Sequence, residues 1–128
     1  MPIDRETVDA PGAPAAIGPY SHAVKAGGLL FCSGQVPLDP KSGELVGNSP
    51  AEQARQCLVN LQAVCEAAGT VLARAVRLTV YTTKIEDFAA INDVYAGFFT
   101  SEPPARAAVG VVALPKGALV EIDAIVAL

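Results

Sequence analysis

The sequence predicts an α+β fold of two layers, in which two helices cover one face of a single mixed sheet. Three observations predict it: a turn signal between two short β-prone runs, two separate segments with helical periodicity, and an apolar C-terminal segment typical of strands. In chain order these elements read ββαβαββ. With 128 residues and 13.1 kDa, the chain has the size of one domain, 1–128, and enough aliphatic residues for a core.

The first strands are expected after a proline-rich start. Residues 1–19 hold four of the ten prolines and show little periodicity, so we expect an extended, irregular lead-in. Residues 21–26 and 29–33 are short β-prone runs. Gly27 and Gly28 lie between them and are typical of a hairpin turn.

The first helix begins at a capping motif. In Ser49-Pro50-Ala51-Glu52 the serine can cap the helix, the proline suits its first turn, and the glutamate completes a capping box. We expect this helix to end at Gly69. Apolar residues inside it recur at spacings of three and four, which predicts one face packed on the sheet; they are Ala54, Leu58, Leu61, Cys65 and Ala68.

A strand and a second helix follow. Residues 75–82 alternate in character and include β-branched side chains, as in a strand. A shorter helix is predicted before Pro103. Its apolar stripe consists of Phe88, Ile91, Tyr95 and Phe98.

The last two strands are predicted at 107–113 and 119–127, on either side of a Pro-Lys-Gly turn. Apolar side chains occupy both faces of these strands, although the helices can cover only one face of the sheet. The uncovered apolar face predicts a homo-oligomer, with pockets for chemistry between its subunits.

Composition excludes several classes of function. The net charge of −4 and the lack of a Lys/Arg cluster argue against nucleic acid as a partner. No stretch reaches about 20 apolar residues, and the mixed charges at the start do not fit a signal peptide. We therefore expect a cytoplasmic protein without membrane association.

The chain also lacks the patterns of common reactive sites. A single histidine, His22, and no clustered Cys or Asp pattern argue against a metal site. Cys32, Cys57 and Cys65 are interpreted as small buried hydrophobic residues. Sequence motifs of the common hydrolases, nucleotide-binding proteins and zinc enzymes are absent.

Arg106 is the permanent charge at the start of the apolar C-terminal segment. A buried guanidinium must be paired, and its natural partner is a carboxylate. Pairing with Glu121 of the same chain would make Arg106 structural. Bidentate binding of a small ligand's carboxylate would make it a site residue. Position and composition alone favour the structural alternative.

Several other residues are candidates, each with a structural alternative. Tyr20 follows a rigid Gly-Pro turn and can either wall a pocket or anchor its own loop. Ser33 and Gly34 offer a hydroxyl and an unshielded backbone N–H, although both are common at strand ends. Asn92 interrupts an apolar helical stripe and can bond either a facing loop or a substrate.

Glu121 is an unusual residue inside a strand. Held in a pocket, its carboxylate can act on water as a general base; exposed on an edge strand, it would have no role. Asp123 lies on the same face of that strand, so the sequence leaves open which of the two carboxylates faces a pocket.

Taken in order, several short motifs resemble the RidA/YjgF/YER057c/UK114 family over nearly the whole chain from Ala13 onward. Each motif alone is weak, but their order and spacing are specific. They are A-I-G-P-Y-S at 16–21, S-G-Q-V-P at 33–37, Q-A-R-Q at 53–56, Asn92 with Tyr95 and Phe98-Phe99, P-A-R-A-A-V at 104–109, and V-E-I-D-A at 120–124.

The resemblance implies a chorismate-mutase-like (YjgF-like) fold, a homotrimer, and three equivalent clefts between subunits. It also implies hydrolysis of reactive enamines and imines such as 2-aminoacrylate, without a cofactor, to 2-oxo acids and ammonia. This is the activity of a 2-iminobutanoate/2-iminopropanoate deaminase.

The resemblance also implies roles for individual residues. By this resemblance, Arg106 binds the substrate carboxylate, and Glu121 is associated with the attacking water. Ala108, also in the cleft, stands where many relatives carry cysteine. The other positions that match the cleft lining are Tyr20, Ser33, Gly34 and Asn92.

Two rival functions are kept beside this one. The first is an endoribonuclease or translation inhibitor, an activity attributed to some relatives of this family. The second is a non-catalytic regulatory module that binds a small carboxylate in the same cleft.

Overall fold

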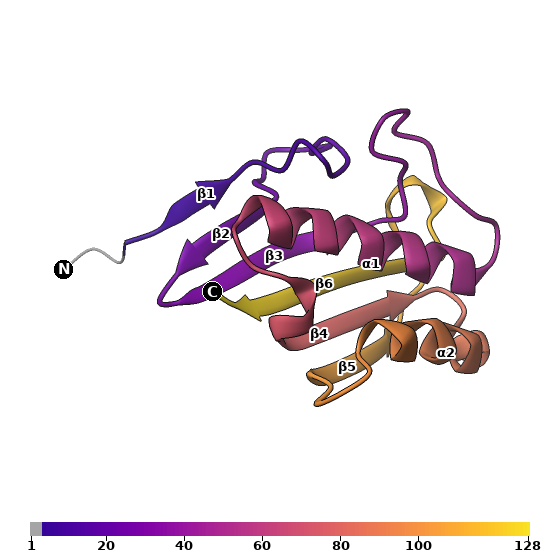
Figure 1. The fold of residues 1–128 in the computed structure, drawn as a ribbon. Coiled ribbons are helices and arrows are strands. Elements are labelled where there is room, and N and C mark those ends of the chain that lie inside the picture. Colours follow the sequence, from indigo (N-terminus) through magenta and orange to yellow (C-terminus); the bar gives the residue numbers. More distant parts are fainter. Residues whose placement is uncertain (1–3) are drawn as a thin grey trace.

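The computed structural model describes residues 4–128, which form one mixed sheet of six strands and two α-helices (Figure 1). The strand order across the sheet is β1-β2-β3-β6-β4-β5. The strands are β1 (Glu6–Val8), β2 (Ala23–Ala26), β3 (Leu29–Gln35), β4 (Ala75–Thr82), β5 (Ala105–Gly110) and β6 (Val120–Ala127). The helices are α1 (Pro50–Ala67) and α2 (Phe88–Phe98), with single 3-10 turns η1 (Leu72–Arg74), η2 (Ile85–Asp87) and η3 (Pro115–Gly117).

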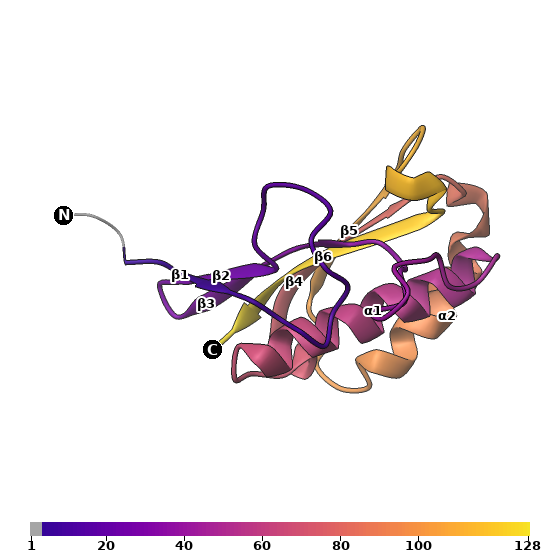
Figure 2. The ribbon, with the colours of Figure 1, turned by 90° about the horizontal axis from the view of Figure 1, so that it is seen from above.

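Both helices lie on the same face of the sheet (Figure 2). Side chains along β6 alternate between buried and half-buried, and the buried set joins α1 in the core. Leu58 and Leu61 of α1 and Leu78 of β4 are fully buried there. The predicted two-layer α+β class is therefore confirmed.

The hairpin between β2 and β3 turns at the two predicted glycines. Gly27 and Gly28 have φ angles of 60° and 79°, a left-handed conformation that glycine adopts at little cost. The two strands pair antiparallel directly beside this turn.

The lead-in at 1–19 differs from the prediction, because Glu6–Val8 forms β1 and pairs antiparallel with β2. Three residues are too few to show the alternation of polar and apolar residues that predicts a strand. This segment becomes a strand because it pairs with the free edge of β2. Residues 1–3 of the predicted lead-in lie outside the described residues. The element order is therefore βββαβαββ.

The predicted strand at 107–113 also ends earlier than expected, since β5 stops at Gly110. β5 runs parallel to β4 at the sheet edge, and Thr82, which pairs with Gly110, is the last residue of β4. Beyond that pair the ladder has no partner strand, and Val112 is fully exposed.

The serine cap predicted for α1 is present, although Glu52 bonds the Ser49 hydroxyl and not the Ser49 N–H that a capping box requires. Ser49 Oγ accepts a hydrogen bond from the Glu52 N–H at 3.2 Å and donates to Glu52 Oε1 at 3.0 Å. After the helix, Gly69 takes a left-handed φ of 86°, as residues that terminate helices commonly do.

Two buried polar side chains of α1 were not predicted. Gln53 Oε1 accepts a hydrogen bond from the Leu119 N–H at 2.7 Å. Asn60 Nδ2 donates to the carbonyls of Val36 and Leu38 at 3.2 and 3.0 Å. These bonds tie α1 to the chain segments just before β6 and just after β3.

The register of β6, β4 and β5 decides which face each functional side chain takes. Leu78 of β4 pairs with Ala124 of β6 and Arg106 of β5, so Arg106 shares the helix face with two buried side chains. Tyr81 pairs with Glu121, three positions further along β4. Glu121 therefore lies on the opposite, open face.

In the part of the chain that the structure describes, neither helix has the length and apolar character needed to cross a bilayer.

Candidate functional site

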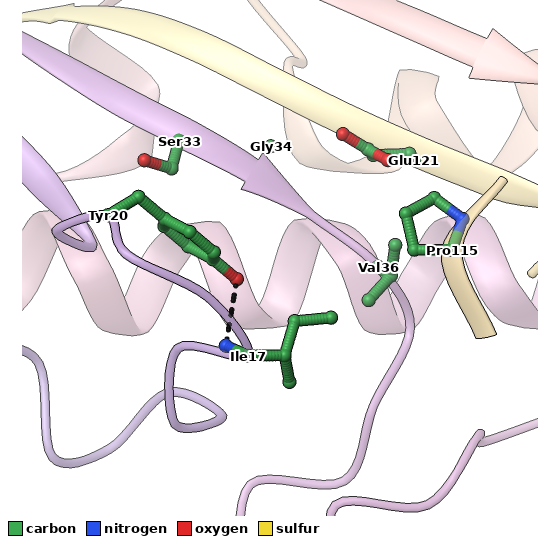
Figure 3. Close-up of a pocket in the computed structure, with 7 residues that line it drawn as sticks. All are labelled: Ile17, Tyr20, Ser33, Gly34, Val36, Pro115 and Glu121. Atoms are coloured by element: carbon green, nitrogen blue, oxygen red, sulfur yellow. Dashed lines mark hydrogen bonds between the residues drawn. The ribbon is translucent and has the colours of Figure 1, made fainter.

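A cavity of about 340 Å³ lies beside the ends of β3 and β6, on the face that the helices leave open (Figure 3). Tyr20, Ser33, Gly34 and Glu121, which are far apart in the sequence, come together there. The rest of its lining is apolar and consists of Ile17, Val36 and Pro115.

A β-bulge in β3 turns two residues toward this cavity. The register between β3 and β6 shifts by one between Cys32 and Gln35, so Ser33 and Gly34 together oppose Asp123. Cys32 and Gln35 are both buried, whereas the two residues between them line the cavity. Bulges commonly redirect side chains beside functional sites.

Gly34 lies directly against the side chain of Glu121. A Cβ atom at position 34 would be 3.0 Å from Glu121 Cδ and 3.3 Å from Cγ, closer than carbon atoms normally pack. The backbone of Gly34 does not have a left-handed φ. Glycine is therefore needed here for close approach, and not for its backbone conformation.

The structure decides between the two carboxylates of β6. Asp123 Oδ2 accepts a hydrogen bond from the Tyr81 hydroxyl at 3.1 Å. Glu121 lines the cavity and has no hydrogen-bond partner among residues 4–128. Burial raises the pKa of Glu121, and the nearby Asp123 charge raises it further. Glu121 is thus a proton acceptor available in an open cavity.

Tyr20 and Ser33 are held by the backbone around the cavity. The Tyr20 hydroxyl accepts a hydrogen bond from the Ile17 N–H at 3.2 Å (Figure 3), and Ser33 Oγ donates to the Ser21 carbonyl at 2.6 Å. Both alternatives for Tyr20 therefore hold, because its hydroxyl anchors its own loop while its ring walls the cavity.

Arg106 of β5 lies outside this cavity, in a separate cluster with residues of α2. Its Nη1 donates a hydrogen bond to Asn92 Oδ1 at 2.8 Å. The guanidinium carbon lies 4.8 Å from the ring centre of Tyr95 and 5.1 Å from that of Phe88. Asn92 therefore bonds Arg106 of β5 and not the facing loop that was one of its two alternatives.

The pairing of Arg106 with Glu121 in the same chain is wrong. Among residues 4–128, the contacts within 4.0 Å between basic and acidic side chains join Lys25 with Glu6 and His22 with Asp9, and neither includes Arg106. The two side chains project from opposite faces, and β4 lies between their strands. Counting odd and even positions in the sequence cannot reveal this, because the face on which each side chain lies depends on how the strands pair.

Ala108 belongs to the Arg106 half of the site. It lies two residues further along the edge strand β5 and pairs with the buried Val80, so it shares the helix face. Within one chain, the candidate residues thus form two groups, one around the Glu121 cavity and one around Arg106.

The histidine and the cysteines take no part in either group. His22 Nδ1 accepts a hydrogen bond from the Ala10 N–H at 3.1 Å, and Nε2 donates to the Pro14 carbonyl at 2.8 Å, which ties the lead-in to β2. The three cysteines are buried, as predicted. Within residues 4–128, no three His, Cys, Asp or Glu side chains gather where they could hold a metal ion.

Sequence reasoning did not identify the apolar wall. Ile17, Val36 and Pro115 come from three separate loops. Ile17 and Val36 lie within the family-like motifs A-I-G-P-Y-S and S-G-Q-V-P. A hydrophobic residue next to glycine or proline in these motifs was the signal that could have identified them.

Residues 10–128 match the family described as Endoribonuclease L-PSP. The chain belongs to this family. The match extends from the lead-in to the last residue and includes both halves of the site. The resemblance to RidA/YjgF proteins is confirmed.

Individual members of the Endoribonuclease L-PSP family are similar over almost their whole length. RutC family protein y4sK of Sinorhizobium fredii is 54% identical over 123 residues, 96% of this chain and 98% of that protein. The 2-iminobutanoate/2-iminopropanoate deaminase of Bos taurus is 48% identical over 121 residues, 94% of this chain and 88% of that protein. The crystal structure of the YjgF gene product of E. coli has a TM-score of 0.90 at 43% identity, covering 95% and 98% of the two chains.

Proposed function

We propose that this protein hydrolyses reactive enamine and imine intermediates such as 2-aminoacrylate to 2-oxo acids and ammonia, as a 2-iminobutanoate/2-iminopropanoate deaminase that needs no cofactor. The observation that carries the proposal is the Glu121 carboxylate, free of protein partners within residues 4–128 and facing a cavity with an apolar wall. Relatives at 46 to 48% identity that are named as this deaminase support it.

The chemistry needs little from the protein. An enamine such as 2-aminoacrylate first gains a proton from solvent at its terminal carbon and becomes an iminium ion. The iminium carbon is already electrophilic, so the protein has to hold the substrate and place a water molecule. Glu121 takes a proton from the water as its oxygen bonds to the carbon of the C=N group. Glu121 then returns this proton to the nitrogen of the resulting carbinolamine. The C–N bond breaks and ammonia leaves, while the hydroxyl gives up its proton to Glu121 and a C=O group forms. A carboxyl with a raised pKa suits this role, because it is a stronger base than an ordinary glutamate.

The proposal places Arg106 of one subunit beside the Glu121 cavity of a neighbour in a homotrimer. Neighbouring strands lie about 4.8 Å apart, so β5 and β6 are about 10 Å apart within one chain, and the two side chains also face away from each other. A guanidinium that is to bind the carboxylate of a substrate held at Glu121 must therefore come from another copy. The exposed Val109 and Phe31 on the open face provide apolar surface for that contact.

Subunit mixing tests this arrangement. Arg106→Ala and Glu121→Gln are each expected to be inactive, but co-refolding them in equal amounts should restore about a quarter of wild-type activity, because about three quarters of random trimers are mixed and each has one intact site. The assay is ammonia release from 2-aminoacrylate generated in place and corrected for spontaneous hydrolysis. No recovery in trimers verified as mixed by mass spectrometry would place both residues' function within one chain.

Arg106→Ala alone measures the role of the guanidinium. Loss of the only partner of a desolvated substrate carboxylate should cost about 3–5 kcal/mol, or roughly a hundred- to several-thousand-fold in kcat/KM. The trimer should persist, since Arg106 makes no ion pair within residues 4–128. Normal turnover with a lowered Tm would instead indicate a structural residue.

The endoribonuclease alternative has less support from the site. Its usual acid–base residue would be a histidine, but His22 is buried and both of its ring nitrogens are engaged by the lead-in. A preparation free of contaminating nuclease that cuts single-stranded RNA, and loses this activity on Glu121→Gln, would favour that alternative. Tight binding of stable 2-oxo acids without turnover of any imine would favour the regulatory module.

A further inference from the structure

The guanidinium of Arg106 rests on one stripe of α2. Phe88, Asn92 and Tyr95 are spaced by four and three residues, so they lie on the same side of the helix. The two rings lie 5.1 and 4.8 Å from the guanidinium carbon, and Asn92 Oδ1 accepts a hydrogen bond from Nη1 at 2.8 Å. All three residues of this α2 stripe contact the same charged group.

We propose that the α2 stripe positions Arg106 for carboxylate binding, with Phe88, Asn92 and Tyr95 acting as positioning residues and not as substrate ligands. This inference rests on the proposed function, because it assumes that the guanidinium receives a substrate carboxylate. It gives Asn92 a role different from the one that the family resemblance implies.

The contacts of the α2 stripe leave most of the guanidinium available. An arginine has five N–H donors in one plane, and Asn92 engages a hydrogen of Nη1 only. Aromatic faces attract the cation without accepting any in-plane N–H bond. No carboxylate within residues 4–128 neutralises the charge. The other donors remain free for a bidentate partner.

Arg106 also needs such support because of where it lies. β5 is the edge strand, and its residues are largely exposed, so the sheet offers the long side chain packing on one side only. Tyr95 provides a fixed surface, since it is buried and its ring packs 4.8 Å from that of Phe99. The α2 stripe thus supplies packing for the Arg106 side chain that no second neighbouring strand provides.

A matched pair of phenylalanines on α2 tests the proposal. Phe88 and Phe98 are both half-buried against the same core, and each lies under an arginine: Phe88 under Arg106, and Phe98 under Arg55 at 5.8 Å. Phe88→Leu should raise the KM for 2-aminoacrylate about three- to tenfold. Its kcat should stay within about twofold, because carboxylate binding is shared by the ground state and the transition state. Phe98→Leu should lower Tm similarly and leave both constants unchanged.

Asn92→Asp separates positioning from simple attachment. An aspartate would hold Arg106 more firmly but would compete with the substrate carboxylate for its charge, so KM should rise by at least tenfold while Tm is unchanged or higher. A wild-type KM for Asn92→Asp would show that the guanidinium held by residue 92 does not bind the substrate carboxylate. That result would overturn the proposal.

A spectroscopic readout keeps this inference distinct from the proposed function. The Arg106 Nε–Hε resonance in NMR spectra should be shifted upfield by the two rings, and Phe88→Leu should remove part of that shift, whereas Phe98→Leu should not. Absence of deaminase activity in the wild-type protein would refute the proposed function alone. Equal effects of Phe88→Leu and Phe98→Leu on KM, or a changed Arg106 resonance without a change in KM, would refute the positioning role.

Discussion

Gly34→Ala is the most direct test of the geometry around Glu121. The added Cβ would lie 3.0 Å from Glu121 Cδ and 3.3 Å from Cγ, whereas unstrained carbon atoms pack at about 3.5–4.0 Å. The atoms that must yield are at the end of a flexible side chain, not in the backbone. The carboxylate is therefore expected to move by roughly an ångström while β3 and β6 remain paired.

This displacement sets the size of the expected effect. A shift of about 1 Å in a catalytic group can reduce the rate about a hundredfold, so kcat/KM should fall by one to two orders of magnitude. The free energy of unfolding should change by less than about 1 kcal/mol, because alanine also reduces the freedom of the unfolded chain.

The assay is ammonia release from 2-aminoacrylate, with thermal unfolding of the same samples. Gly97→Ala is the matched control, since Gly97 lies in α2 without a left-handed φ, and a Cβ there would meet nothing within 4 Å beyond its own helix backbone and chain neighbours. It should keep full activity and stabilise the helix slightly. Full activity of Gly34→Ala would show that the position of the Glu121 carboxylate does not matter, and the proposed base would then be wrong.

Three further predictions concern pH, stability and specificity. The pKa of Glu121 is raised, so the folded state binds its proton more tightly than the unfolded state does, and stability is lost as pH rises through the folded pKa. Glu121→Gln should therefore raise Tm at neutral pH, and thermal unfolding should show no such gain at pH 3. The acid limb of the pH profile of wild-type kcat/KM should lie above the pKa of an ordinary glutamate. Asn60→Leu should cost about 1–3 kcal/mol in urea unfolding, because it removes the two hydrogen bonds that Asn60 Nδ2 donates to the carbonyls of Val36 and Leu38. A cost below about 0.5 kcal/mol would contradict this interpretation of the α1 contacts. Ile17→Ala should shift the ratio of kcat/KM values several-fold in favour of the bulky imine derived from leucine over the imine derived from alanine. The reason is that it widens the cavity at a half-exposed position of the apolar wall. An unchanged ratio in a competition assay would show that Ile17 does not contact the substrate side chain.

Local signals explain why much of the fold was predictable. The Gly27-Gly28 turn, the Ser49 helix cap and the apolar periodicity of α2 each act within a few residues, and the structure contains all three. β1 was not predictable in this way, because its three residues pair through the free edge of β2. The buried Asn60 was missed for a similar reason, since the two carbonyls to which it donates are more than twenty residues away.

The sequence predicted which residues line the Glu121 cavity, but it did not predict how the candidate residues are arranged. Tyr20, Ser33, Gly34 and Glu121 do line one cavity. The separation of Arg106 from Glu121 follows from the strand order β6-β4-β5, which no local pattern contains. An isolated glycine inside a strand run is a known sign of a bulge, so Gly34 carried a signal for the register shift.

The register shift in β3 bears on how such a protein can lose its chemistry and keep its fold. If the codon for either Ser33 or Gly34 were deleted, β3 and β6 would pair without interruption, and the residues on both sides would still alternate correctly toward the core. The shortened chain would form a more regular sheet but could not bring backbone against the Glu121 carboxylate. A descendant one residue shorter in β3 is therefore expected to superimpose on this structure and yet to lack the proposed activity, so a single gap at this point of an alignment would predict an inactive member.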